Sequence, residues 1–157
     1  MTATYRLQLH AGFTFADAEA QVSYLARLGV SHLYLSPILQ AVPGSQHGYD
    51  VLDHTRVSEE LGGEKALLSL AATAREAGLG LVVDVVPNHM ALVAPEHANA
   101  PLWETLRGGP SAATAHWFDV DWDAGGGKLG LPVLGGTLEE ALAAGEVTLG
   151  EREGEPV

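Results

Sequence analysis

Hydrophobic and polar positions divide the first part of the chain into a regular succession of elements. Apolar and polar side chains alternate over residues 2–9, which predicts a β-strand. Apolar residues recur at helical spacing over 15–28 and over 64–77, and a glycine follows each stretch, as is common at a helix end. Two short apolar runs, 30–35 and 81–86, lead to prolines and predict buried strands.

The order of these elements is strand, helix, strand, helix, strand, which predicts an α/β fold. Because the strand runs are apolar at successive positions, we expect them to be buried on both faces and to pair in parallel. Parallel strands joined by helices form right-handed crossovers almost without exception. Three such strands form either a small open sheet or one arc of a larger barrel, since an α/β barrel closes with about eight strands.

The pattern is less regular elsewhere. Residues 38–63 predict a long polar loop with several glycines. Beyond residue 88 no further strand-helix unit follows, although 129–134 and 147–149 suggest short strands of a separate subdomain. We therefore expect a first domain at 1–90 and the start of a second at 91–157.

Composition and charge narrow the classes of function. Hydrophobic residues make up 46% of the chain, enough for a packed core, and no apolar run reaches the length of a membrane span. The net charge of −12 repels nucleic acid and leaves neutral or cationic ligands favoured. The start of the sequence lacks the pattern of a secretory signal, and the absence of cysteine fits a cytoplasmic location.

Polar residues gather where the strand over 81–86 ends. Asp84 interrupts an apolar run, and Asn88 and His89 follow directly after the strand. A carboxylate within such a run needs a partner, because an unpaired buried charge is costly. In a barrel, the carboxyl ends of the strands face the active site. The residues taken alone equally fit a structural aspartate followed by a turn.

A second polar cluster spans residues 44–54. Gly48 allows close approach of the backbone, and Tyr49 offers a flat apolar face with a polar tip, a combination that suits a sugar ring. A metal site from His47, Asp50, Asp53 and His54 is conceivable. Their spacing matches no known metal motif, so we expect no metal here.

Together the two clusters resemble the α-amylase family of glycoside hydrolases, in which a strand ending in DVVPNH follows a loop containing HGYD. The sequence is more specifically similar to the maltooligosyl trehalose synthases of that family. The segments that carry this likeness are 5–9, 34–38, 44–54, 59–63, 83–90, 118–122 and 131–135.

The resemblance implies a fold and a sugar site. The fold would be the first three β/α units of a (β/α)8 TIM barrel, followed by the start of a subdomain inserted after strand three. Tyr49 would stack under the glucose at the cleaved bond, with His47 beside that subsite. His89 would form a hydrogen bond with a hydroxyl of the same sugar, the 6-hydroxyl.

Three further residues would support that site. Asp84 would pair with an arginine and, with Asn88, fix the loop around His89, while Asp50 would support the loop that bears the tyrosine. That arginine would lie on the next strand, beyond this segment, so within this chain we expect Asp84 to be exposed or paired with a stand-in such as water or Arg6. Since parallel strands end at one edge, the loops that carry Tyr49 and His89 should converge there.

The resemblance also implies the chemistry and its limits. These enzymes use a nucleophilic aspartate on strand four and an acid/base glutamate on strand five, so this segment would hold no catalytic residue and be inactive alone. The whole enzyme would convert the reducing-end α-1,4 link of a maltooligosaccharide into an α,α-1,1 link by intramolecular transglucosylation. It would need no cofactor. Its partners would be the maltooligosaccharide and the remainder of the barrel. The alternatives are another α-amylase-family hydrolase and a non-catalytic glucan-binding α/β domain.

Overall fold

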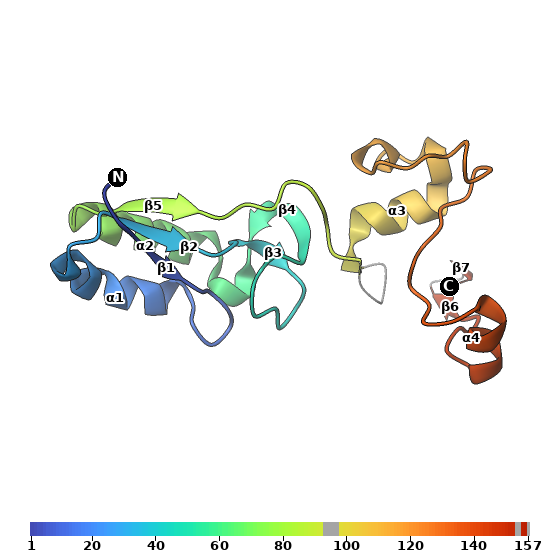
Figure 1. Ribbon diagram of the computed structural model, residues 1–157, viewed down its shortest axis with the longest axis horizontal. Helices are drawn as coiled ribbons and strands as arrows, with labels where there is room; N and C mark the ends of the chain where they lie inside the picture. Colours follow the sequence, from blue (N-terminus) through green and yellow to red (C-terminus); the bar gives the residue numbers. More distant parts are fainter. Residues whose placement is uncertain (93–97, 153–154, 157) are drawn as a thin grey trace. The chain divides into compact units, whose positions relative to one another are not determined.

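The computed structural model describes residues 1–92, 98–152 and 155–156 (Figure 1). The chain forms two compact units, Met1–Trp117 and Phe118–Val157. This division falls later than the boundary expected after residue 90. The expected boundary concerns the barrel and its inserted subdomain, and it stays a prediction.

A three-stranded parallel sheet lies at the centre of the first unit. Its strands are β1 (Thr4–Leu7), β2 (His32–Leu35) and β5 (Gly80–Val83), in the order β1-β2-β5. The helices α1 (Phe15–Leu28) and α2 (Gly63–Glu76) connect them. The predicted α/β order and the parallel pairing are therefore confirmed.

The two faces of this sheet differ. Side chains of one face pack with both helices into a single core, which includes Leu33 and Leu35 from β2, Phe15 from α1 and Leu70 from α2, each at 0% exposure. The neighbouring register positions Arg6, Tyr34 and Val82 lie on the other face and are exposed or half-buried. We call this second surface the open face. It carries polar side chains at the positions that would line a barrel interior.

The expected loop over 38–63 is in large part regular, so that prediction was wrong. β3 (Leu39–Ala41) pairs antiparallel with β4 (Val51–Val57), and a short 3-10 helix, η1 (Glu59–Leu61), follows. The alternation of apolar and polar residues does not reveal β4, because only its first two residues are buried, while its middle is polar and exposed. Two register irregularities also interrupt the pairing of the two strands.

The segment after β5 departs from the prediction in two ways. The strand ends at Val83 rather than at residue 86, although the amide of Asp84 still donates to the carbonyl of Leu35 at 3.0 Å. Helical elements then follow in a stretch expected to be irregular: α3 (Ala100–Gly108), η3 (Gly109–Ser111) and η4 (Ala115–Trp117). The start of α3 has a recognisable signal, because Asn99 accepts from the amide of Leu102 and a proline lies in the first turn.

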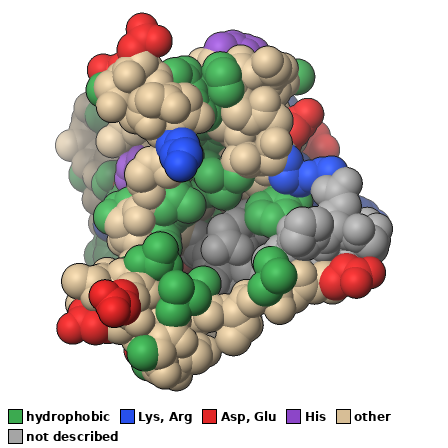
Figure 2. All heavy atoms as spheres, turned by 90° about the vertical axis from the view of Figure 1, so that its right-hand side faces the viewer, with side chains coloured by type: hydrophobic (Ala, Val, Ile, Leu, Met, Phe, Trp, Pro, Cys, Tyr) green, Lys and Arg blue, Asp and Glu red, His purple; other side chains and the backbone are tan. Residues whose placement is uncertain are grey.

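The second unit holds α4 (Leu138–Ala144) and the two-residue strands β6 (Glu151–Arg152) and β7 (Glu155–Pro156). The strands suggested at 129–134 and 147–149 are not formed: the structure describes both stretches, and both are irregular. Apolar side chains are widely exposed here, including Val133 at 54%, Leu138 at 58% and Leu149 at 88%. Figure 2 shows apolar side chains (green) exposed on the face that it presents.

No helix among the residues described is both long and apolar enough to cross a bilayer.

Candidate functional site

Four side chains meet on the open face around one carboxylate oxygen. Asp84 Oδ2 accepts hydrogen bonds from the hydroxyl of Tyr49 at 2.5 Å, from the hydroxyl of Tyr34 at 3.3 Å and from Arg6 Nη1 at 3.3 Å. Arg6 Nη2 also donates to the hydroxyl of Tyr49 at 3.1 Å. Of the outcomes expected for Asp84, which were exposure or pairing with water or Arg6, the structure shows the pairing with Arg6.

The arrangement fixes the charge of each group. The hydrogen bond from Tyr49 lowers the pKa of Asp84, with Arg6 and Tyr34 acting in the same sense against the effect of desolvation. The same bond to Asp84 raises the pKa of the Tyr49 phenol. Asp84 is therefore held as a carboxylate and Tyr49 as a neutral donor, which leaves the aromatic face of Tyr49 as its surface for a ligand.

Tyr49 and His89 converge at the end of the sheet where Asp84 follows β5, as predicted. His89 Nε2 lies 3.1 Å from the backbone oxygen of Tyr49, and since a carbonyl oxygen only accepts, the imidazole donates. Both side chains are exposed, with Tyr49 at 38%. A flat apolar ring next to an imidazole is an arrangement that suits one hexose, whose C–H face can stack while its hydroxyls form hydrogen bonds.

His47 lies beside the tyrosine in the same loop. The ring centroids of His47 and Tyr49 are 6.0 Å apart, with 31° between the ring planes. His47 Nδ1 accepts the amide proton of Tyr49 at 3.1 Å. That bond leaves no proton on Nδ1 to share with Asp50 Oδ1, which lies 3.6 Å away. With Nδ1 as an acceptor, the contact between His47 and Asp50 is not an ion pair.

Asp50 shapes the loop itself. It accepts a hydrogen bond from Ser45 Oγ, and the same oxygen of Ser45 accepts from the amide of Gly48 at 3.1 Å. Gly48 has a φ of 76°, and a Cβ there would lie 2.7 Å from the carbonyl oxygen of Pro37. Only glycine fits this turn without displacing the backbone. Asn88, the remaining predicted residue, is exposed in the segment after β5.

Sequence analysis did not single out two residues of this site, Gln8 and Tyr34. Gln8 Nε2 donates to the carbonyl oxygens of Gln46 at 3.1 Å and His47 at 3.5 Å. A signal for both existed in the alternation over residues 2–9, which places Arg6 and Gln8 on one side of the expected strand, although β1 itself ends at Leu7. Tyr34 is the register partner of Arg6 on β2.

The four residues considered for a metal site do not form one cluster, although His47 and Asp50 are neighbours. His54 Nε2 donates to the backbone oxygen of Val86 at 2.8 Å, and Asp53 pairs with Arg56 Nε at 3.2 Å. Among the residues that the structure describes, no group of three His, Asp or Glu side chains is placed to hold a metal ion.

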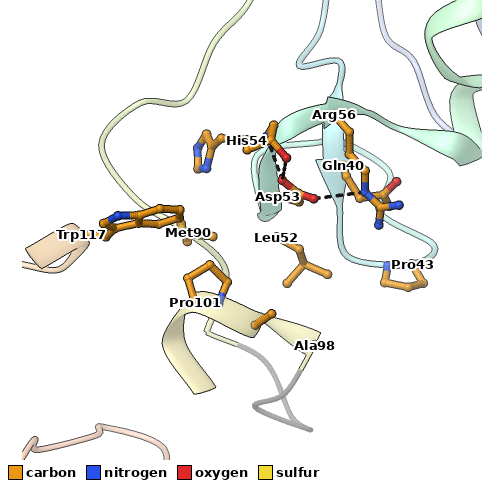
Figure 3. Close-up of a pocket in the computed structure, with 12 residues that line it drawn as sticks. Gln40, Pro43, Leu52, Asp53, His54, Arg56, Met90, Ala98, Pro101 and Trp117 are labelled. Carbon is orange, nitrogen blue, oxygen red and sulfur yellow. Dashed lines mark hydrogen bonds and ion pairs between the residues drawn. The ribbon is translucent and has the colours of Figure 1, made fainter. Parts of the chain in front are cut away.

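A separate cavity of about 450 Å³ lies between the β3–β4 hairpin and the first residues of α3, with Met90, Ala98 and Trp117 also in its wall (Figure 3). Its polar lining is already bonded within the protein: Asp53 accepts from Thr55 and Arg56, and Gln40 donates to the carbonyl oxygen of Ala41. What remains is an apolar wall, formed by Leu52, Met90, Pro101 and Trp117. This cavity shares no lining residue with the cluster around Asp84.

The pKa of Asp84 leads to a prediction on acid stability. Because the folded value lies below the ordinary 3.8, the contacts of Asp84 stabilise the fold above that pH and are lost as the pH falls through the folded value. The urea midpoint of the wild-type chain should exceed that of Asp84→Asn at about pH 6, and the gap should close towards about pH 2. A gap that stays constant over this range would show that the charge of Asp84 does not stabilise the fold.

Comparison with known proteins defines the family. The sequence profile described as "Alpha amylase, catalytic domain" matches residues 18–118. The chain therefore belongs to the α-amylase family.

Within this family the chain is similar to maltooligosyl trehalose synthases over nearly all its length. It is 54% identical over 143 residues, or 88% of the chain, to a Mycobacterium tuberculosis (strain H37Rv) protein named "Putative maltooligosyl trehalose synthase". The solved maltooligosyltrehalose synthase of Arthrobacter ramosus superposes on 100% of the chain with a TM-score of 0.88 and 46% identity. Another solved maltooligosyl trehalose synthase covers 98% with a TM-score of 0.90 and 44% identity. These comparisons confirm the predicted resemblance.

The chain spans about a fifth of the length of these relatives: 19% of the mycobacterial protein, and 20% and 21% of the two solved chains.

Proposed function

We propose that this chain is part of an enzyme that converts the reducing-end α-1,4 link of maltooligosaccharides into an α,α-1,1 link by intramolecular transglucosylation. The observation that carries the proposal is the cluster of Tyr49, His89 and Asp84 at the carboxyl ends of parallel strands, in a chain similar throughout to maltooligosyl trehalose synthases. Active sites of α/β barrels lie at these ends of the strands.

We infer that the sheet is the first arc of a (β/α)8 TIM barrel. Support comes from the open face, where Arg6, Tyr34 and Asp84 are polar and incompletely covered although they lie beside a well-packed core. Strands four to eight would cover this face in a closed barrel. Residues 1–90 would belong to the barrel and 91–157 to the inserted subdomain. The exposed apolar residues of the second unit support further packing partners, since such patches mark contact surfaces.

The sugar would bind against Tyr49, with His89 and His47 at its edge. Asp84 would hold the tyrosine through its hydroxyl and would not itself act on the substrate, because one of its oxygens already accepts three hydrogen bonds. Asn88 would shape the segment that presents His89. Asp50 would hold the turn at Gly48 through Ser45. Each of these roles makes the aromatic platform rigid before a ligand arrives, which limits the entropy cost of binding.

The catalytic carboxylates would come from strands four and five, outside this segment. A retaining mechanism needs two carboxyl groups about 5 Å apart, one as nucleophile and one as acid/base. No cofactor is required for this chemistry. A cytoplasmic location, the absence of nucleic acid or membrane partners, and the maltooligosaccharide substrate are parts of the same proposal.

The reducing ends of the substrate distinguish the proposal from hydrolysis. A full-length protein that carries this segment should consume the reducing ends of maltopentaose without releasing an equal amount of glucose, because the released sugar is rejoined at its anomeric hydroxyl. An increase in reducing ends would instead support an α-amylase-family hydrolase. Binding of maltopentaose without any turnover would support a non-catalytic glucan-binding domain.

A further inference from the structure

We propose that Gln8 is a positioning residue for the sugar site, one that holds the loop bearing His47 and Tyr49 against the segment that directly follows β1. The proposal rests on the proposed function, because it concerns the same site. Gln8 has no contact with the rings of His47 and Tyr49 among its described hydrogen bonds. It acts on the backbone that carries them.

The backbone at Gln8 is fixed on both sides. The carbonyl oxygen of Leu7 accepts from the amide of Ser36 at 3.0 Å, and the amide of Leu9 donates to the buried hydroxyl of Ser36 at 2.8 Å. Leu7 and Leu9 are both buried in the core, at 7% and 2% exposure. Gln8 therefore projects onto the open face from a fixed segment directly after β1, as a supporting side chain should.

The amide of Gln8 is matched to what surrounds it. Its NH2 group donates to the carbonyl oxygens of Gln46 and His47, at 3.1 and 3.5 Å, while its oxygen lies 3.5 Å from Arg6 Nη2. A carboxylate would retain the contact with Arg6 but would turn an acceptor towards two carbonyl oxygens. A side chain with no polar atom would lose both contacts. Only an amide both accepts from Arg6 and donates to the two carbonyl oxygens.

The loop needs a support at this point. Its ends are tied by the amide of Gly44, which donates to the carboxylate of Glu60 at 3.0 and 3.1 Å, and by the amide of Val42, which donates to the carbonyl oxygen of Asp50 at 3.0 Å. Gln8 holds residues 46 and 47 from the side of the sheet. These residues directly precede Gly48 and Tyr49, so their position sets the direction of the aromatic ring.

A double-mutant cycle in a full-length protein carrying this segment tests the proposal. Gln8→Glu should lower kcat/KM for maltopentaose about 3- to 10-fold, the scale of one intramolecular hydrogen bond. Gln8→Met should do the same, because it also lacks the donor and adds no charge. In a Tyr49→Ala background either change should have almost no further effect, because Gln8 acts through that ring. Gln21→Glu, on the exposed side of α1, is the matched control and should leave kcat/KM unchanged.

Hydrogen exchange provides a readout that does not depend on activity. The amides of Gly48 and Tyr49 donate within the loop, to Ser45 Oγ and His47 Nδ1, so both should exchange several-fold faster in the Gln8 variants while the melting temperature stays that of the wild type. Wild-type kcat/KM in both Gln8 variants, or the same loss with and without Tyr49, would overturn the proposal. If the wild-type protein forms no trehalosyl product, the proposed function fails, and exchange at Gly48 and Tyr49 alone decides the role of Gln8: faster exchange supports it and unchanged exchange overturns it.

Discussion

Replacing Tyr49 by alanine should lower kcat/KM for maltopentaose about 5- to 150-fold in a full-length protein carrying this segment. The range corresponds to about 1–3 kcal/mol, the usual loss on removing a stacked aromatic contact that excludes water. The structure gives the reason: the ring is exposed, while its hydroxyl is fixed by Asp84 and Arg6. His89→Ala should have an effect of the same order.

Two controls separate stacking from general damage. Tyr24→Ala removes a tyrosine of similar exposure from α1, at 54%, and should leave kcat/KM unchanged. Tyr49→Phe keeps the ring but loses the hydroxyl bonds to Asp84 and Arg6, and it should fall between the wild type and Tyr49→Ala. Wild-type kinetics in both Tyr49→Ala and His89→Ala would show that the sugar binds elsewhere.

The isolated chain of 157 residues should show no turnover of maltopentaose, neither transfer nor hydrolysis. The nucleophile and the acid/base group are expected on strands four and five. Asp84 is no substitute, because Oδ2 accepts from Tyr49, Tyr34 and Arg6 and the group serves the site as an ion-pair partner. The expected loss of turnover is complete, and it is larger than the loss expected from any single substitution in the site.

The measurement compares equal molar amounts of the isolated chain and the full-length protein, followed by product chromatography. Far-ultraviolet circular dichroism establishes whether the isolated chain is folded, so that an unfolded sample is not mistaken for an inactive one. Detectable turnover by a pure sample of the isolated chain would show that it contains its own catalytic carboxylates.

The parallel sheet could be predicted because its core residues are neighbours in the sequence and form recognisable apolar runs. A short apolar run such as the one around Leu33 and Leu35 favours a buried strand, and stretches with apolar residues at helical spacing lie between such runs. The β3–β4 hairpin could not be predicted in the same way. The middle of β4 faces solvent, so its pairing with β3 leaves no apolar alternation to detect.

The site was predictable where a residue type itself demands a partner. Asp84 within an apolar run required a donor, and the structure supplies Arg6, Tyr34 and Tyr49. The strand alternation places Gln8 on the same side as Arg6, but its contacts could not be predicted. Its partners are backbone carbonyl oxygens 38 and 39 positions away, which leave no trace in the side-chain pattern. The roles of Tyr49 and His89 towards a sugar remain predictions.

A crystal structure of a full-length protein carrying this segment, in complex with a maltooligosaccharide, tests the central claim most directly. The account predicts a glucose ring whose C–H face packs on Tyr49 and whose hydroxyl lies within hydrogen-bonding distance of His89, about 2.6–3.2 Å. Asp84 should still be paired with Arg6 and Tyr49 beneath the sugar. A maltooligosaccharide bound in the active site with the ring of Tyr49 uncovered and His89 out of reach would contradict the account.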